Sequence, residues 1–187
     1  MRTMEYTWYG VSTPSIECLH LTKERGTLRA LSTGANHDGH YAYAVTLTPG
    51  WVFRELTLHG YDDRQLEVRR NRDGTWSVNQ KPRLDLKGAV DIDLAFSPFT
   101  NTLPVRRLSL PVGGRAEIIT AYVDVPSLRV TPDPQAYTRT ATNLYLYESL
   151  DSDFTRQITV DAHGFVIDYP GLYSRDPAAG KPQRPNA

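Results

Sequence analysis

Asp91 and Asp93 are the residues of this chain whose spacing most resembles a catalytic pair. They stand two positions apart in the segment GAVDIDLAF, and alternate residues of a β-strand project from the same face, about 6–7 Å apart. Paired carboxylates at roughly that separation can hydrolyse a glycosidic bond. The same carboxylates could instead face solvent or pair with Arg106 and Arg107, a short way downstream. We favour this structural interpretation, because nothing in the sequence indicates a raised pKa.

A second group that could do chemistry is His37, Asp38 and His40 in the segment NHDGHY. A metal site would need further ligands, and the other three histidines are distant in the sequence. We therefore expect a solvated hairpin loop here and no metal ion. The chain also contains no G-x-S-x-G elbow, P-loop or dinucleotide fingerprint. These observations predict a protein without a cofactor and without catalytic residues.

The segment 97–108, SPFTNTLPVRRL, has an unusual composition. Two prolines bracket the polar run Thr100–Thr102, and Thr and Asn side chains hydrogen-bond nearby backbone in tight loops. We expect an ordered, largely irregular loop held by these side chains. If the chain resumes as a strand, Arg106 and Arg107 face opposite sides, and one of them points inward. An inward arginine needs a partner, and we expect a carboxylate, first of all that of Asp91 or Asp93.

The elements that must position these residues are mostly strands, because the dominant period of the apolar residues is two. The dipeptides Asp73-Gly74 and His163-Gly164 predict tight hairpin turns. Residues 13–24 fit either a helix opening at Thr13-Pro14 or a strand, and we slightly favour the strand; a short helical turn could form near 98–103. The other predicted strands are 4–9, 27–34, 40–48, 51–59, 64–70, 75–79, 88–96, 115–125, 142–148 and 154–161.

Composition narrows the class of protein. The 187 residues carry 21 Lys plus Arg and 21 Asp plus Glu, and this balance argues against a protein that binds nucleic acid. No apolar run is long enough for a membrane span, and the single cysteine, Cys18, permits no internal disulfide. We therefore expect a cytoplasmic protein. The predicted organisation is one domain over residues 1–175 and a disordered tail rich in Pro and Ala over 176–187.

Many consecutive strands with few crossovers predict an all-β fold with a mainly antiparallel, strongly twisted sheet. Such a sheet must close, stack or be covered to protect its inner face. Several strands carry bulky side chains on both faces. A sheet that curls around a cavity explains this, and so does a sandwich.

The segment 97–108 and its flanks carry a more specific pattern. In these residues the chain resembles the bacterial family described as putative glycolipid-binding, over about residues 5–175. The resemblance is strongest from Asp73-Gly74 and Trp76 onward. The other matching segments are Gly88–Asp93, Ser97–Leu108, Tyr122–Pro126, Gln135–Thr138, Val160-Asp161, Gly164–Tyr173 and Arg175.

What the resemblance implies is a single strongly curved, mainly antiparallel sheet, a spiral β-roll or half-barrel with at most short helices. Its shape is similar to the curved sheets of periplasmic lipoprotein carriers, which hold acyl chains in an apolar concavity. The family has no established catalytic residues to carry over. The N-terminal half departs more, since Pro49-Gly50 precedes Trp51 where an acidic or polar residue is expected.

We therefore expect a protein that binds a glycolipid or another amphiphile in an apolar concavity, without catalysis. Two alternatives stay open: a small hydrolase using Asp91 and Asp93 or the histidine group, and a protein-interaction domain. The oligomeric state and the openness of the concavity are not determined by the sequence. The candidate cavity-wall residues are Tyr41, Tyr43, Trp51, Tyr145 and Tyr147. The candidate rim or head-group residues are Phe99, Asn101, Arg106, Arg107, Gln135, Tyr137 and Tyr169.

Overall fold

The computed structural model describes residues 3–24, 26–60, 64–125 and 127–178, so the predicted disordered tail lies outside the described residues from position 179 on. The strands are β1 Thr3–Gly10, β2 Ile16–Glu24, β3 Thr27–Asn36, β4 Gly39–Leu47, β5 Phe53–His59, β6 Gln65–Arg70, β7 Trp76–Val78, β8 Lys81–Pro82, β9 Asp91–Leu94, β10 Arg115–Val123, β11 Val130–Ala141, β12 Leu144–Ser149, β13 Thr155–Val160, β14 Val166–Tyr169 and β15 Tyr173–Ser174. The helices are the 3₁₀ turns η2 Leu84–Leu86 and η3 Pro98–Asn101, and the short α-helix α1 Thr102–Leu108.

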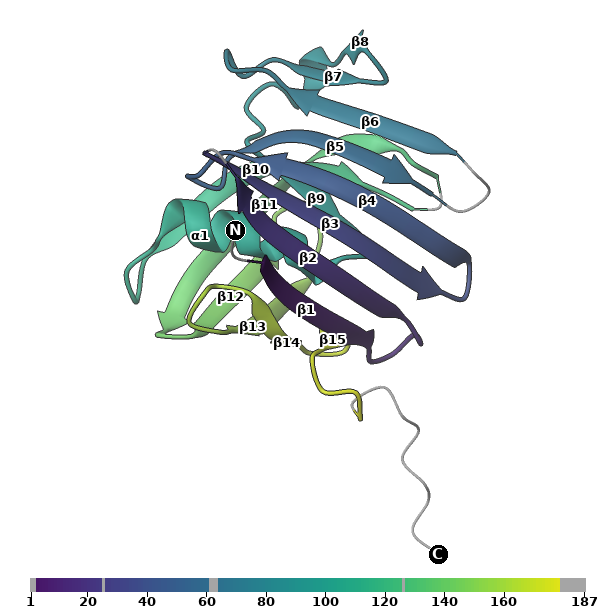
Figure 1. Cartoon of the computed structure of the whole chain (residues 1–187). Helices are drawn as coiled ribbons and strands as arrows, with labels where there is room; N and C mark the ends of the chain where they lie inside the picture. The colour runs from purple at the N-terminus through teal and green to yellow at the C-terminus, as the bar shows by residue number, and fades with distance from the viewer. Residues whose placement is uncertain (1–2, 25, 61–63, 126, 179–187) are drawn as a thin grey trace, which may run out of the picture.

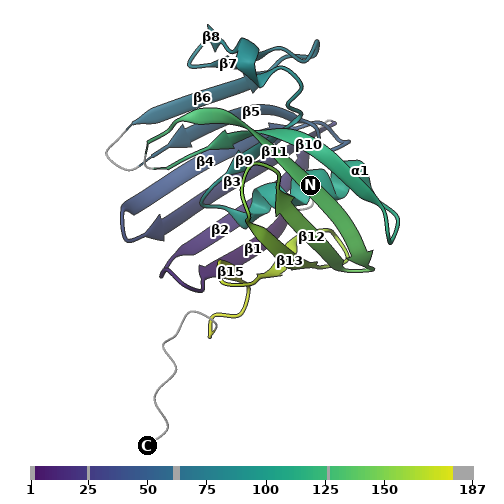
Figure 2. The ribbon, with the colours of Figure 1, turned by 180° about the vertical axis from the view of Figure 1, so that it is seen from behind.

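One sheet contains all fifteen described strands, in the order β8-β7-β6-β5-β4-β3-β2-β1-β15-β14-β13-β12-β11-β10-β9. Neighbouring strands are antiparallel except β9 and β10, which are parallel. The first and last strands, β1 and β15, pair in the middle and join two halves, β1–β8 and β9–β15. In Figure 1 the second half curls behind the first, with α1 between them, and in Figure 2, seen from behind, the second half lies in front. The predicted all-β fold with one curved, mainly antiparallel sheet is confirmed.

The segment 13–24, for which the sequence allowed either a helix or a strand, forms strand β2 from Ile16. Its residues alternate between buried and exposed positions. Leu19 and Leu21 are buried and His20 between them is exposed, as a period of two requires. Both predicted hairpin turns are also present. Gly74 and Gly164 have φ values of 88° and 82°, a conformation that glycine adopts without a steric penalty.

Strand β11 is the main element that the sequence analysis missed. Pro132 and Pro134 interrupt its pattern, and proline is normally excluded from central strands because it donates no backbone hydrogen bond. Here both prolines lie in the part of β11 that pairs with β10 but extends beyond the pairing with β12, which begins at Gln135. Proline is tolerated here because only β10 pairs in register with this part of β11.

The expectation of a largely irregular loop over 97–108 is wrong, because η3 and α1 account for most of it. Pro98 opens η3, and the Oγ of Ser97 accepts a hydrogen bond from the backbone N–H of Phe99 at 3.2 Å. Pro104 falls in the first turn of α1, where backbone N–H groups have no partner within the helix. Proline is thus compatible with both helical turns. Arg106 and Arg107 consequently lie on a helix and not on opposite faces of a strand.

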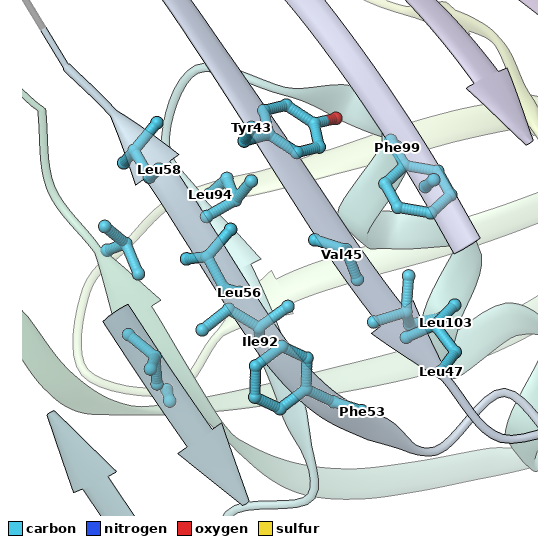
Figure 3. Close-up of a cluster of buried hydrophobic side chains, with 14 of the residues drawn as sticks. Tyr43, Val45, Leu47, Phe53, Leu56, Leu58, Ile92, Leu94, Phe99 and Leu103 are labelled. Atoms are coloured by element: carbon cyan, nitrogen blue, oxygen red, sulfur yellow. The ribbon is translucent and has the colours of Figure 1, made fainter. Parts of the chain in front are cut away.

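The segment from β9 to α1 fills the inside of the roll. Figure 3 shows Ile92 and Leu94 of β9 packed with Val45 of β4 and Leu56 of β5, beside Phe99 and Leu103. All are at most 2% exposed. A second cluster, on the other side of α1, joins Val105 to residues of β11–β14. The inner face of the half β1–β8 is therefore packed solid.

An ion pair fixes α1 to β9. Arg107 donates to both carboxylate oxygens of Asp91, with the shortest contact 2.5 Å from Nη2 to Oδ2, and Asp91 is fully buried. Burial raises the pKa of Asp91, and the bonds and charge of Arg107 oppose that rise. Arg106 instead places its guanidinium 5.3 Å from the ring centre of Trp51. The expectation that one of the two arginines pairs with Asp91 or Asp93 is confirmed.

A buried carboxyl group connects the half β1–β8 to the start of η3. Glu17 of β2 accepts hydrogen bonds at one oxygen, Oε1, from the hydroxyls of Ser32, Tyr43 and Ser97, at 2.5–2.8 Å. Its other oxygen, Oε2, is buried and has no partner among the described residues. Burial raises the pKa of Glu17 to about 7, against the lowering effect of these hydrogen bonds.

Replacing Arg107 by methionine should destabilise the protein by about 3 kcal/mol, because it leaves the buried Asp91 charge uncompensated. Urea denaturation measures the free energy of unfolding. Arg106→Met is the matched control and should cost about 1 kcal/mol or less. The double variant Asp91→Asn/Arg107→Met should recover much of the loss. Equal shifts in the two single methionine variants would contradict the role given to the Arg107–Asp91 pair.

Glu17→Gln should make stability less dependent on pH. Between the ordinary pKa of 4.5 and the folded value of about 7, folded Glu17 holds a proton that the unfolded chain releases. Its contribution to stability is thus present at acid pH and is lost as the pH rises through this window. From pH 5 to pH 8 the wild type should lose about 2 kcal/mol more than the variant. Parallel pH–stability curves would show that Glu17 does not titrate in this range.

Candidate functional site

A hollow lies on the inner side of the half β9–β15, beside β9 and η3. We call it the tyrosine pocket; its volume is about 350 Å³. It lies on the face of β9 opposite to the packed core, so that Asp93 points toward it while Ile92 packs against β4 and β5. The residues that line it are Asp93, Leu94, Ala95, Ser97, Pro98, Asn101, Tyr122, Asp133, Tyr147, Ser149, Asp151, Ser152, Phe154, Tyr169, Leu172 and Tyr173.

Strand register places the acidic residues of the tyrosine pocket together. Asp93 of β9 lies beside Tyr122 of β10, and β10 in turn pairs with the part of β11 that carries Asp133 and Gln135. The Nε2 group of Gln135 donates to Oδ2 of Asp93 at 2.6 Å and to Oδ2 of Asp133 at 2.5 Å. Thr100 of η3 donates to the other oxygen of Asp93 at 2.8 Å. An amide and a hydroxyl, both uncharged, thus hold two carboxylates in place.

The environment raises the pKa of both carboxyl groups. For Asp133 burial dominates, and the charges of Asp93 and Asp151 add to it, so that its pKa rises to about 6 despite the hydrogen bond from Gln135. For Asp93 burial again raises the pKa, while the bonds from Gln135 and Thr100 lower it. The described residues that line the pocket include no Lys, Arg or His. The pocket therefore holds acidic groups without a cationic partner of its own.

Aromatic rings form the opposite wall. Tyr147 lies 6.3 Å from Tyr169 and 5.9 Å from Phe154, measured between ring centres. Burial and the charge of Asp93 raise the pKa of the Tyr147 and Tyr169 hydroxyls, which stay protonated and can donate hydrogen bonds. Within the described part of the chain, no hydrogen bond occupies the hydroxyls of Tyr122, Tyr147 and Tyr169. They are available to a ligand.

Asn101 and Gln135 connect the pocket to the second core cluster. The Nδ2 group of Asn101 donates to the buried hydroxyl of Tyr137 at 2.9 Å, which fixes η3 over β11. Gln135 is fully buried, and its Oε1 atom has no hydrogen-bond partner among the described residues. Of the three side chains expected to bond nearby backbone, Thr100 does so at the carbonyl of Ser97, Asn101 instead bonds the distant Tyr137, and the Oγ1 of Thr102 is buried without a partner among the described residues.

The predicted rim residues separate into two groups. Asn101 and Tyr169 line the tyrosine pocket, and Gln135 and Tyr137 lie directly behind it. The other three lie away from it: Phe99 is fully buried in the first core cluster, Arg107 is paired with Asp91, and Arg106 stacks on Trp51.

Of the predicted cavity-wall residues, the structure brings only Tyr147 into the lining of the tyrosine pocket. Tyr41, Tyr43 and Trp51 belong to the first core cluster, and Tyr145 belongs to the second. Gly34 permits the position of Tyr41, because a Cβ at Gly34 would lie 2.1 Å from its ring. The apolar concavity expected around these residues is filled by β9, η3 and α1.

Sequence reasoning missed Asp133, Asp151, Tyr122 and Phe154 as pocket residues. Asp133 lies between the two prolines that concealed β11, and recognition of that strand would have placed it two residues from Gln135 on one face. Asp151 and Phe154 lie in the connection between β12 and β13. No periodic signal in the sequence marks a loop residue as part of a pocket on a distant strand.

The histidine group forms the predicted exposed turn. His37 contacts Asp38 at 3.3 Å, and both side chains are largely exposed beside the β3–β4 hairpin. No group of three or more His, Cys, Asp or Glu residues in the described chain is arranged to hold a metal ion. Ala42 and Ala44 face the outer side of β4, where they line a shallow apolar groove with Leu31.

Comparison with known proteins agrees with this architecture. The family model for putative glycolipid-binding proteins matches residues 5–175. A crystal structure of a DUF1089 family protein from Pseudomonas aeruginosa is similar with a TM-score of 0.72 and 36% sequence identity, covering 86% of this chain and 91% of that one. The search of curated proteins found no match. No helix in the described residues is long and apolar enough to span a bilayer. The chain belongs to the putative glycolipid-binding family.

Proposed function

We propose that this protein binds a glycolipid and that the tyrosine pocket holds the sugar head group. The main support for this proposal is that carboxylates and tyrosine rings line the same pocket and face each other across it. Sugar hydroxyls can donate to Asp93 and Asp133, and they can accept from the free hydroxyls of Tyr147 and Tyr169. The apolar faces of a sugar ring can pack on the aromatic rings. The volume of about 350 Å³ lies within the range of small-ligand sites.

The packed interior leaves the acyl chain little room. Val45, Leu56 and their neighbours already occupy the inner face of the half β1–β8, so a tail cannot lie there without displacing the core. Leu172 lines the pocket, Leu150 adjoins the lining residues Ser149 and Asp151, and these two leucines are 38% and 41% exposed. They are positioned to cover the first methylenes of a tail that leaves the pocket, and the rest of the tail stays outside.

Removing this apolar edge should weaken binding of a tailed sugar but not of a free sugar. Leu172→Ser should lower the affinity for octyl glucoside, below its micelle concentration, about fivefold, because it removes roughly 1 kcal/mol of methylene burial. Its affinity for methyl glucoside should be unchanged. Leu31→Ser, an exposed leucine on the outer face of β3, is the matched control. Titration calorimetry or chemical-shift titration measures both ligands.

Two outcomes of this titration are informative. Equal affinities of octyl and methyl glucoside for the wild type would remove the role of the tail but keep the sugar site. Absence of binding of any glycoside at millimolar concentration, with the fold intact, would reject the proposed function. The protein-interaction alternative would then take its place.

One observation favours a second function, hydrolysis of a glycosidic bond. Gln135 brings the Oδ2 atoms of Asp93 and Asp133 to within about 5 Å of each other, close to the carboxyl separation of retaining glycosidases. The pair differs from the predicted one, because Asp91 is occupied by Arg107. Protonated Asp133 would donate to the leaving oxygen while Asp93 attacks the anomeric carbon, and water would release the sugar.

This second function predicts release of nitrophenol from nitrophenyl glycosides near pH 5.5, where Asp133, with a pKa of about 6, is mostly protonated. The rate should fall as the pH rises past 6 and should be lost in Asp93→Asn. If no nitrophenol forms while the glycosides bind, the protein is a binding protein only.

A further inference from the structure

The charge of the tyrosine pocket restricts the ligands that it can accept. Asp93, Asp133 and Asp151 line it, and no basic side chain does so within the described residues. The chain as a whole has equal numbers of acidic and basic residues, so this concentration of negative charge is local. An anionic head group would be repelled, and a neutral one would leave the charges uncompensated.

The neighbouring arginines lie outside the lining of the pocket, although the charge of Arg156 opposes the rise in the pKa of Tyr169. Arg107 is paired with Asp91, and Arg175 donates to Asp161 at 2.9 Å. Arg156 stacks on the ring of Phe154 at 4.6 Å and donates to a backbone carbonyl, and it does not line the pocket. The carboxylates of Asp93 and Asp133 are instead held by the neutral amide of Gln135, whose own oxygen is buried without a partner among the described residues.

The aromatic wall fits the same kind of ligand. The face of an aromatic ring carries partial negative charge and attracts cations, most strongly where water is excluded. Tyr122, Tyr147, Tyr169, Tyr173 and Phe154 all line the pocket. Several rings combined with carboxylates form the arrangement by which proteins bind ammonium groups.

We propose that the head group bound in the tyrosine pocket carries a positively charged amine, as in an amino sugar; this inference rests on the proposed function. The ammonium group donates hydrogen bonds to Asp93 and Asp133 and contacts the rings of Tyr147 and Tyr169. A choline head group shares the cation but adds a phosphate, which the three carboxylates disfavour. The amino sugar is therefore the better match.

The test compares ligands of one ring size and different charge. Methyl glucosaminide, methyl N-acetylglucosaminide, methyl glucoside and methyl glucuronide are titrated into the full-length protein at pH 6.5, with phosphocholine as a separate arm. We expect the glucosaminide to bind roughly tenfold more tightly than the neutral sugars. The glucuronide should bind most weakly. The preference for the amine should shrink as sodium chloride is raised from 50 to 500 mM, because salt screens the attraction.

Asp133→Asn should abolish the preference for the glucosaminide over methyl glucoside, because it replaces a carboxylate of the pocket by a neutral amide of the same size. Asp151→Asn, an exposed position at the pocket, is a second variant in case the first does not fold, and it should reduce the preference. Glu24→Gln, exposed at the end of β2, is the matched control and should change nothing.

The outcomes separate this inference from the proposed function. Equal binding of glucosaminide and glucoside, or tighter binding of the glucuronide, would overturn the cationic head group while the sugar site stands. Binding of phosphocholine without binding of any sugar would overturn the amino sugar and the proposed function but retain the ammonium site. Absence of binding in every arm would overturn both.

Discussion

The segment from Asp91 to Leu108 runs through the inside of the roll, and its polar groups must be satisfied there without bulk water. This constraint determines much of the remaining structure. Asp91 requires Arg107, and this pair fixes the angle between β9 and α1. Ser97 shares Glu17 with two other hydroxyls, and this contact connects η3 to the half β1–β8. The bond between Ser97 and Glu17 joins elements that are far apart in the sequence, so the interior segment also helps to hold the two halves together.

The same segment separates two environments. On one face of β9, Ile92 and Leu94 belong to the first core cluster; on the other, Asp93 reaches the tyrosine pocket, whose lining also includes Leu94. Strand alternation alone produces this division, since successive side chains point to opposite faces. A buried interior strand can therefore supply a charged group to a binding site without exposing its backbone. The cost is a raised pKa of the carboxyl group, which hydrogen bonds from Gln135, Thr100 and the backbone of Leu94 oppose at Asp93.

Most strands of this fold could be predicted from the sequence, because alternation in segments such as 40–48 and 115–125 is local information. Strand β11 could not, since the permissive position of Pro132 and Pro134 depends on where β12 ends. The helical form of 97–108 was anticipated only as a short turn near 98–103, although each proline occupies a position that a helical turn tolerates.

The candidate site could be predicted only in part. Asn101, Tyr147 and Tyr169 were named from the sequence and do line the pocket. Tyr41 and Tyr43 have the same residue type and the same alternation, yet they are core residues. The pocket residues differ from these core residues in the half of the sheet to which they belong, because β9 and α1 fill the inner face of the half β1–β8. That packing depends on long-range contacts. Asp133 became visible as a partner of Asp93 only through the register of β10 and β11.

The pairing of β1 with β15 has a consequence for how the molecule is made. Tyr9 and Gly10 pair with Ser174 and Tyr173, the indole of Trp8 donates to the carbonyl of Val166, and the N–H of Val11 donates to the carbonyl of Leu172. On the ribosome the N-terminal strands emerge first, and the edge of β1 must wait for almost the whole chain before its partner arrives. An unpaired edge is where other chains can add, and closure of such distant contacts is slow. The nascent domain is thus exposed to aggregation until Tyr173 and Ser174 have emerged and this two-residue strand covers the edge of β1 in the middle of the sheet.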